Sequence, residues 1–299
     1  AALYAGVSIA ALALVVALCG GGYMRLALRQ AEVIQRVNSG SRRRSAGWRV
    51  HTPFWALYRQ EMREVLTVPT YATNCLTGVV MFPVLLVVMA VGIGRETDGM
   101  ALSEVVAQFV PKSIYLAVAA GFLALTCTMG LAVSTAVSRE GARHDMRRIY
   151  PVAGSVQLGA KLLMGMTFNL AAALVSAVAL WVLLPGMWLE TLGALAVSQL
   201  FSLLWCLMSL LLDVYHPKLK WKTETEAVKQ SMNAMISMFG GMILIAVLVG
   251  AAVLLTLWGW PVSAALGADV VLLALLDAAL WMVLSRRASI TYCLREYSK

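Results

Sequence analysis

The sequence has few charged residues: only 13% of its 299 residues are Asp, Glu, Lys or Arg. A soluble domain carries about 25%. In contrast, 61% of the residues are hydrophobic, and the mean hydropathy is +0.80. A soluble fold of this length keeps too much surface in water to hide so many apolar side chains. The composition therefore excludes a soluble enzyme, a DNA-binding domain and a disordered tail, and it predicts an integral membrane protein.

The sequence also lacks the residue clusters that bind metals or cofactors. Its five cysteines are dispersed without a CxxC or other metal-ligand spacing, which predicts free thiols. The three histidines form no HExxH motif or other cluster. The glycine-rich loops that cradle nucleotide phosphates, GxxxxGKS/T and GxGxxG, are absent too. We therefore expect a chain that is not an enzyme, with no catalytic residues and no cofactor or metal of its own.

Seven apolar runs are long enough to cross a bilayer, for which a helix needs about 20 residues. None alternates with the period of a β-barrel strand, so the backbone must form helices to satisfy its hydrogen bonds in lipid. We predict an all-α polytopic membrane protein with seven transmembrane helices. The predicted spans are residues 3–24, 74–94, 114–137, 162–184, 191–212, 231–257 and 264–285.

The basic residues are distributed unevenly between the two sides of these spans. All but two of the 24 lie in alternate segments, and the remaining loops contain only Arg95 and Lys112. This asymmetry follows the positive-inside rule, and it predicts an outside N-terminus and a cytoplasmic C-terminus. It also accounts for the net charge of +9 without nucleic-acid binding. We expect a multi-pass protein of the plasma membrane, of the bacterial cytoplasmic type. The basic segments are 25–73, 138–161, 213–230 and 286–299.

These patterns divide the chain into four parts. Residues 1–24 contain the first span, in a chain that we expect to be part of a longer protein. Residues 25–73 combine a basic linker, suited to anionic membrane lipid, with an amphipathic helix at 54–68. Residues 74–285 form a six-helix module, and 286–299 form a basic cytoplasmic tail.

Two cytoplasmic segments of the six-helix module also have helical patterns. Residues 139–150 place Ala, Met, Ile and Tyr on one side and charged residues on the other, with Ser138 as the predicted cap and Pro151 as the stop. This helix is either an interfacial loop or a docking helix for a cytosolic partner.

In the second segment, Thr223 and Glu226 have the spacing of a capping box, so a helix should begin there. A helix that continued from there to Leu257 would be longer than the bilayer is thick. We expect it either to project into the cytosol or to break near Gly240 and Gly241.

Asp269 and Asp277 are the only acidic residues inside a predicted span. They are eight residues apart on one helix, too far to share a proton as a catalytic pair does. Intramembrane carboxylates are expensive unless they are paired or hydrated, and they suggest function by default. For Asp269 we favour hydrogen bonds to Ser, Thr or Asn of neighbouring helices. For Asp277 that role and a place in a substrate path are evenly balanced.

Two cytoplasmic stretches resemble the ABC-2-type exporter permeases. In residues 138–161, a span ends in Ser-Arg-Glu-Gly, and a short helix, a proline and a lysine that opens the next span follow. In residues 213–229, an aspartate precedes Pro-Lys-Leu-x-Trp and then Glu-Ala-Val-Lys. The amphipathic helix at 54–68 also resembles the connector helix that precedes the first span of such a permease, and the number of spans after it, six, fits the family's topology. The resemblance covers about residues 54–285. The matching residues are Ser138, Arg139, Glu140, Gly141, Pro151, Lys161, Asp213, Pro217, Lys218, Leu219, Trp221, Glu226, Ala227, Val228 and Lys229.

The resemblance implies the permease subunit of an ATP-driven exporter, similar to the C-terminal half of a long two-module permease. The first span, 3–24, would then be the last helix of an upstream module. ATP and Mg²⁺ would bind a separate cytosolic ATP-binding cassette subunit, and the preceding permease half or a second permease would be a further partner. The substrate would be amphipathic or apolar, because these spans supply little polar lining. One departure is the outer loop 258–263, which is too short for the re-entrant helix pair common in this family.

The resemblance also assigns roles to individual residues. One group would couple the permease to the ATPase, and a second would form a cytoplasmic loop motif. The coupling residues would be Ser138, Arg139, Glu140, Gly141, Arg143, Asp145 and Arg147, and the loop motif would be Asp213, Pro217, Lys218, Trp221, Glu226 and Lys229.

Two other functions stay open. A membrane enzyme acting on a lipid could use Asp277 with cytoplasmic arginines near the head-groups, although the sequence shows no nucleophile constellation. A structural anchor or assembly protein would need neither substrate nor ATPase. Co-purification of a P-loop ATPase would distinguish transport from both alternatives.

Overall fold

The structure is a computed structural model that describes residues 52–96, 110–130, 132–228 and 231–294, together with 103, 106 and 108. All regular secondary structure in this part of the chain is helical. Five of its helices are long and apolar enough to cross a membrane. These observations support the expected all-α membrane protein. The predicted span 3–24, nearly all of the basic linker and the end of the tail lie outside the described residues.

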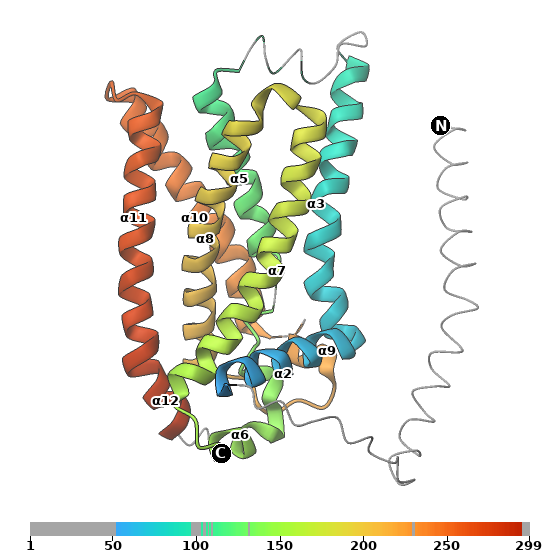
Figure 1. The fold of residues 1–299 in the computed structure, drawn as a ribbon, viewed down its shortest axis with the longest axis vertical. Coiled ribbons are helices and arrows are strands. Elements are labelled where there is room, and N and C mark those ends of the chain that lie inside the picture. The colour runs from blue at the N-terminus through green and yellow to red at the C-terminus, as the bar shows by residue number, and fades with distance from the viewer. Residues whose placement is uncertain are drawn as a thin grey trace, which may run out of the picture. The chain divides into compact units, whose positions relative to one another are not determined.

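The five long helices begin and end close to the predicted spans. The centre of the bundle is formed by α7 and α8, because α7 packs against α3 and α8, and α8 also packs against α5 and α11 (Figure 1). A π-helical turn at Leu284–Ala288 continues α11 into the short α12, Ser289–Leu294. The five helices are α3 (Pro69–Glu96), α7 (Gly154–Leu183), α8 (Trp188–Tyr215), α10 (Met232–Leu257) and α11 (Val262–Val283).

The predicted span 114–137 is wrong in its second half. The helix α5 covers Lys112–Thr128, and the chain then turns through buried residues until the short helix η1 begins at Ser138. Glycine allows this close packing, since a Cβ at Gly165 of α7 would overlap the Val133 side chain. Non-helical backbone at this depth is tolerated because protein rather than lipid surrounds it.

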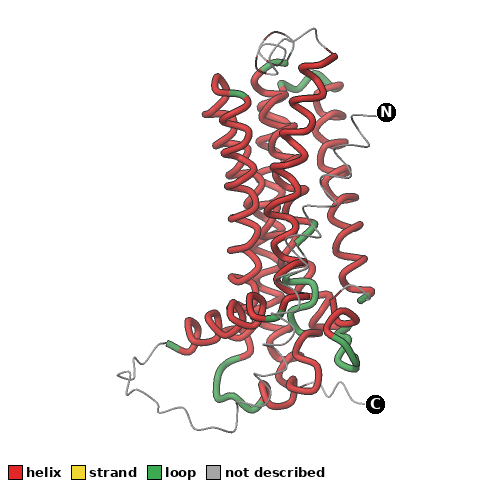
Figure 2. Tube along the Cα trace, turned by 90° about the vertical axis from the view of Figure 1, so that its right-hand side faces the viewer, coloured by secondary structure: helices red, strands yellow, loops and turns green. Residues whose placement is uncertain are grey.

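Four short helices gather at one end of the bundle, which we call the charged end. They are α2 (Pro53–Thr67), α6 (His144–Arg148), α9 (Glu224–Val228) and α12. Figures 1 and 2 show α2 lying crosswise to the long helices. Extended backbone at Val68 ends α2, and Pro69 begins α3 in a new direction. The bounds of α2 match the predicted amphipathic helix 54–68 to within one residue.

The predicted helix at 139–150 is wrong, because the segment is not one continuous helix. A 3₁₀ turn at Ser138–Arg143 contains Gly141 in a left-handed conformation with φ +50°, and only then does α6 begin. Glycine is needed here on two counts. Its φ is unfavourable for other residues, and a Cβ would lie 2.8 Å from the Trp221 ring.

The expected capping box at Thr223 does begin a helix. The Glu226 amide donates to Thr223 Oγ1 at 3.4 Å in the first turn of α9. Both expectations for its continuation are wrong, since α9 ends at Val228 and α10 begins separately at Met232. The helix α10 then runs unbroken through Gly240 and Gly241. These glycines give room for Trp205 of α8, which a Cβ at either position would crowd.

Candidate functional site

A buried network of charges lies where α2, η1, α6 and α7 meet at the charged end. Glu61, Glu140, Arg147 and Lys161 are each at most 7% exposed. Lys161 Nζ lies 2.7 Å from Glu140 Oε1 and 2.9 Å from Glu61 Oε1. Arg147 pairs with Glu61 and with Glu64 of α2, and its Nη1 lies 3.2 Å from Glu140. Each buried charge therefore has at least one opposite charge in direct contact.

The same network reaches two further segments of the chain. Tyr292 of α12 donates a hydrogen bond to Glu140 Oε1 at 2.9 Å, and the Nδ1 atom of His144 lies 2.6 Å from Glu140 Oε2. Lys161 also donates to the carbonyl of Ala136 at 3.0 Å, in the turn before η1. Glu140 thus joins α6, α7 and α12 through one carboxylate.

The pairing outweighs the cost of burial. Burial alone would raise the pKa of Glu140, but Lys161, the His144 hydrogen bond and Arg147 lower the pKa to about 2. Burial opposes the charge of Glu61 too, yet Lys161 and Arg147 hold its pKa below the ordinary value. Burial would lower the pKa of Arg147, whereas Glu61, Glu140 and Glu64 raise it. Glu61, Glu140 and Arg147 are therefore charged at neutral pH.

A second buried cluster centres on Asp213, near the end of α8. Its carboxylate accepts hydrogen bonds from the backbone amides of Val137 at 2.6 Å and Ser138 at 3.0 Å, and from the Ser138 hydroxyl. Asn233 of α10 donates to the same carboxylate at 2.9 Å. Asp213 therefore caps the start of η1 and anchors it to α8 and α10.

The two stretches that resemble the permease family meet at Ser138. The Lys218 amide donates to Ser138 Oγ at 2.9 Å, and Trp221 Nε1 donates to the Ser138 carbonyl at 2.9 Å. The Trp221 ring covers Gly141. Asp213, which belongs to the same stretch as Lys218 and Trp221, accepts a hydrogen bond from the Ser138 amide. Residues about 80 positions apart in the sequence thus form one interlocked unit.

The other predicted site residues occupy different positions. Arg139 is 2% exposed and lies over the Tyr71 ring, 5.4 Å from its centroid. Glu140 and Arg147 are inside the network, so they do not face a partner directly. Arg143 and Asp145 are exposed.

In the loop motif, Lys218 Nζ lies 3.1 Å from Glu226 Oε1. Pro217 lies in the turn between Asp213 and Trp221, and Lys229 lies outside the described residues. The motif therefore stabilises the segment that holds Ser138.

Sequence reasoning missed Glu61, Glu64, His144 and Tyr292. A signal for Glu61 existed, because an acidic residue directly before Met62 interrupts the apolar side of the connector helix. No local pattern indicates that Tyr292 contacts Glu140, since the two residues are 152 positions apart.

The helix α6 and the two residues that follow it carry exposed apolar side chains. Met146 is 65% exposed and Ile149 is 79% exposed, with Tyr150 next to them at 41%. Arg143 and Asp145 lie on the same short segment. Figure 1 shows α6 at the extremity of the charged end. We call Met146, Ile149 and Tyr150 the α6 patch.

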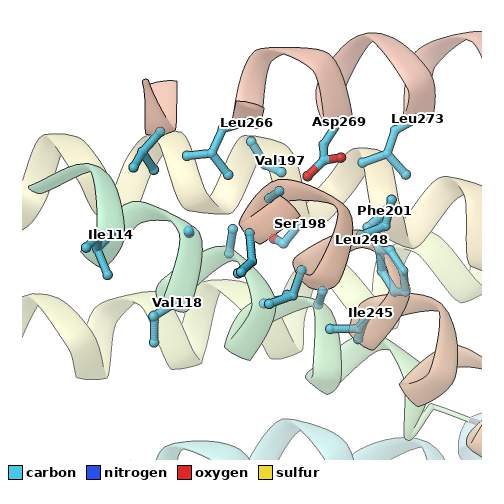
Figure 3. A pocket seen from close by; sticks show the side chains of 18 of the residues that line it. Ile114, Val118, Val197, Ser198, Phe201, Ile245, Leu248, Leu266, Asp269 and Leu273 are labelled. Atoms are coloured by element: carbon cyan, nitrogen blue, oxygen red, sulfur yellow. The ribbon is translucent and has the colours of Figure 1, made fainter. Parts of the chain in front are cut away.

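A cavity of about 410 Å³ lies toward the opposite end of the bundle, among α5, α8, α10 and α11 (Figure 3). Its walls are almost entirely apolar, and Asp269 is its one charged residue among the described ones. The hydrogen bonds expected for Asp269 are not found among the described residues. Asp277 does not line this cavity. It is 6% exposed, and neither of its carboxylate oxygens has a hydrogen-bond partner in the described part of the chain.

Comparisons with known proteins do not identify the chain. No family model, curated protein or solved structure matches it. Any functional assignment therefore depends on its residues and on the geometry described above.

Proposed function

We propose that this chain is the permease subunit of an ATP-driven exporter of the ABC-2 type, coupled to a separate cytosolic ATP-binding subunit. The convergence of the two family-like stretches at Ser138 supports this proposal. The absence of a nucleotide-binding loop from the sequence is consistent with ATP and Mg²⁺ binding on the partner.

The observation that carries the proposal is the α6 patch and the buried network behind it. An exposed apolar patch is typical of a site that binds a protein or a membrane, and the charges of both signs beside it, Arg143 and Asp145, favour a protein. Immediately behind this patch, Arg147 and His144 of α6 join the network around Glu140. A short helix held so firmly can transmit a displacement, whereas a freely moving loop cannot.

The network provides the route by which such a displacement reaches the spans. The ion pair of Glu140 and Lys161 connects η1 to α7. The hydrogen bond from Tyr292 to Glu140 connects η1 to α12, which follows α11 in the chain. A partner that binds the α6 patch and changes shape would shift α7 and the turn after α5 together, as packed elements do in switching proteins. Arg143 and Asp145 would add charged contacts to the same partner.

An amphipathic or apolar substrate fits this architecture. The described spans carry little polar surface, and the cavity among α5, α8, α10 and α11 has almost entirely apolar walls. A preceding permease half or a second permease would form the other wall of the substrate pathway, and membrane lipid would surround both. A lipid-acting enzyme is less well supported. Its candidate residue, Asp277, has no hydrogen-bond partner among the described residues that could position it for catalysis.

Affinity purification in mild detergent from the native host tests the proposal. We expect a P-loop ATPase to co-purify, and the double variant Met146→Asp, Ile149→Asp to lose it because charges replace the apolar contact. Met232→Asp is the matched control, since Met232 is 69% exposed at the charged end but lies on α10. The measurement is mass spectrometry of the eluate together with ATP hydrolysis by the complex.

Retention of the ATPase by the double variant, or its absence from the wild-type eluate, would contradict the proposal. Substitution of Glu140 is less informative, because it would disrupt the buried network as well as any coupling. Size-exclusion profiles of all variants establish that the fold is kept.

A further inference from the structure

We propose that the cavity beside Asp269 binds a lipophilic cation, with its apolar body among α5, α8, α10 and α11 and its positive group at the Asp269 carboxylate. Figure 3 shows this carboxylate directed from α11 into the space between the helices, toward Ser198. The claim that such a ligand is exported depends on the function proposed above, whereas the claim that it binds does not.

The size and walls of the cavity suit a small organic molecule. Its volume of about 410 Å³ lies within the range of ligand pockets, roughly 300–1,000 Å³. Small residues of α5, including Ala117, Ala120 and Gly121, leave this space open, and larger apolar side chains such as Phe201 and Leu248 form the other walls. These surfaces favour an apolar body through removal of its surface from water.

The polar atoms of the cavity select for positive charge. Ser198 Oγ donates its hydrogen to the carbonyl of Leu195, and Thr256 Oγ1 donates to the carbonyl of Val253. The Thr256 hydroxyl is therefore left with acceptor lone pairs and no free hydrogen, and Ser198, which is 0% exposed, offers no hydrogen to a ligand either. With Asp269 also an acceptor, the described lining offers negative charge and acceptors but no basic group. An anion would find no donor there.

The Asp269 carboxylate lacks a positively charged partner, which a cationic ligand would supply. Asp269 has no hydrogen bond or ion pair among the described residues, although a charged group inside a membrane is expensive when it is unpaired. A bound ammonium, phosphonium or similar cation would neutralise it. Asp277 is two turns further along α11 and does not line the cavity, so it is a suitable control carboxylate.

Tetraphenylphosphonium and tetraphenylborate provide a direct test, because they have nearly the same size and shape and opposite charge. The full chain is placed in nanodiscs of zwitterionic phosphatidylcholine, and equilibrium binding of each labelled ion is measured against empty nanodiscs. We expect saturable binding of the phosphonium and at least tenfold weaker binding of the borate. Asp269→Asn should weaken phosphonium binding at least tenfold, and Asp277→Asn should change it less than twofold.

A second pair of variants tests the location. A Cβ at Gly121 would have no neighbour within 4 Å and Gly121 lines the cavity, so Gly121→Leu should fill the space and abolish saturable binding. Gly267 of α11 is equally open but does not line the cavity, and Gly267→Leu should leave binding unchanged.

Equal affinity for the two ions, or an unchanged affinity in Asp269→Asn, would overturn the inference and indicate a cavity for an uncharged chain such as a lipid tail. The comparison of the two ions needs only the wild-type protein, so a variant that fails to fold does not remove the test. An ATPase that co-purifies while no phosphonium binds would reject this inference and leave the proposed function standing.

Discussion

The charged end and the membrane-embedded half of the bundle bury carboxylates in opposite ways. Glu61 and Glu140 at the charged end are surrounded by Lys161, Arg147 and hydrogen-bond donors. Asp277 in α11 is almost as deeply buried, yet both of its oxygens lack a partner in the described structure. The same chemical group is therefore held by complete pairing in one region and left without pairing in the other.

This difference separates two kinds of role. Removing charges from water costs several kcal/mol per ion, and only excellent pairing geometry offsets that cost. The paired network thus specifies how α2, α6, α7 and α12 fit together. An unpaired carboxylate adds no such stability. Where it also lines a cavity, as Asp269 does, its presence within a span is better explained by a ligand.

The largest expected effect comes from breaking the network at its centre. Lys161→Met would leave Glu61 and Glu140 buried with one cation fewer, which should destabilise the protein by about 3–5 kcal/mol. The buried Cys127 and Cys206 allow unfolding in detergent to be followed with a thiol-reactive dye. The exposed Lys220 gives the control Lys220→Met, whose unfolding temperature should stay within about 1 °C of wild type, because surface changes have small effects. An equally stable Lys161→Met protein would show that the network does not stabilise the charged end.

Acid should lower the stability of the folded protein, by less than Lys161→Met does. The pKa of Glu140 falls from an ordinary value of 4.5 to about 2 in the folded protein, so its stabilisation is complete above about pH 4.5 and is lost as the pH falls toward 2. This residue alone predicts a loss of about 2 kcal/mol at pH 3. Thiol-dye unfolding between pH 7 and pH 3 measures it. Lys161→Met should show a shallower acid dependence, and an identical slope in both proteins would contradict the assigned cause.

The smallest expected effect has the opposite sign. Asp277→Leu should leave stability unchanged or raise it by about 1 kcal/mol, because it removes a buried carboxyl whose oxygens have no partner. Asp213→Leu is the matched control at another buried aspartate, and it should destabilise the protein by leaving the amides of Val137 and Ser138 without an acceptor. A marked loss of stability in Asp277→Leu would assign that residue a structural role and remove the contrast between the two regions.

Much of the fold could be predicted from the sequence because apolar runs report membrane spans directly. The runs locate α3, α7, α8, α10 and α11, although α3 begins five residues and α7 eight residues before the predicted spans 74–94 and 162–184. The prediction failed at 129–137, where the residues are apolar enough for a span but the chain turns. The hydropathy of Val133 does not reveal that Gly165 of α7 lets it pack there, nor that Asp213 caps the following turn.

The sequence picked out some residues of the charged end but neither the whole network nor its arrangement, since Glu61, His144 and Tyr292 were missed. The motif positions Ser138, Glu140 and Asp213 stood out by their order in the sequence, and the structure shows that they organise the charged end. Their burial could not be foreseen, because the opposite charges of Glu140 come from α6 and α7 and its tyrosine partner from α12. An amphipathic pattern shows that a helix has two sides but not which partner each side meets.

The sequence by itself determined that this is a helical membrane protein, because composition and run length are properties of the chain that need no contacts. It also determined where charge gathers. Only the tertiary structure decided which charges are paired, since Glu61 and Lys161 are 100 positions apart and meet only after α2 crosses α7. The tertiary structure likewise placed Asp269 at a cavity and buried Asp277 between helices. This difference depends on how α11 packs against its neighbours, because the two residues are of the same type.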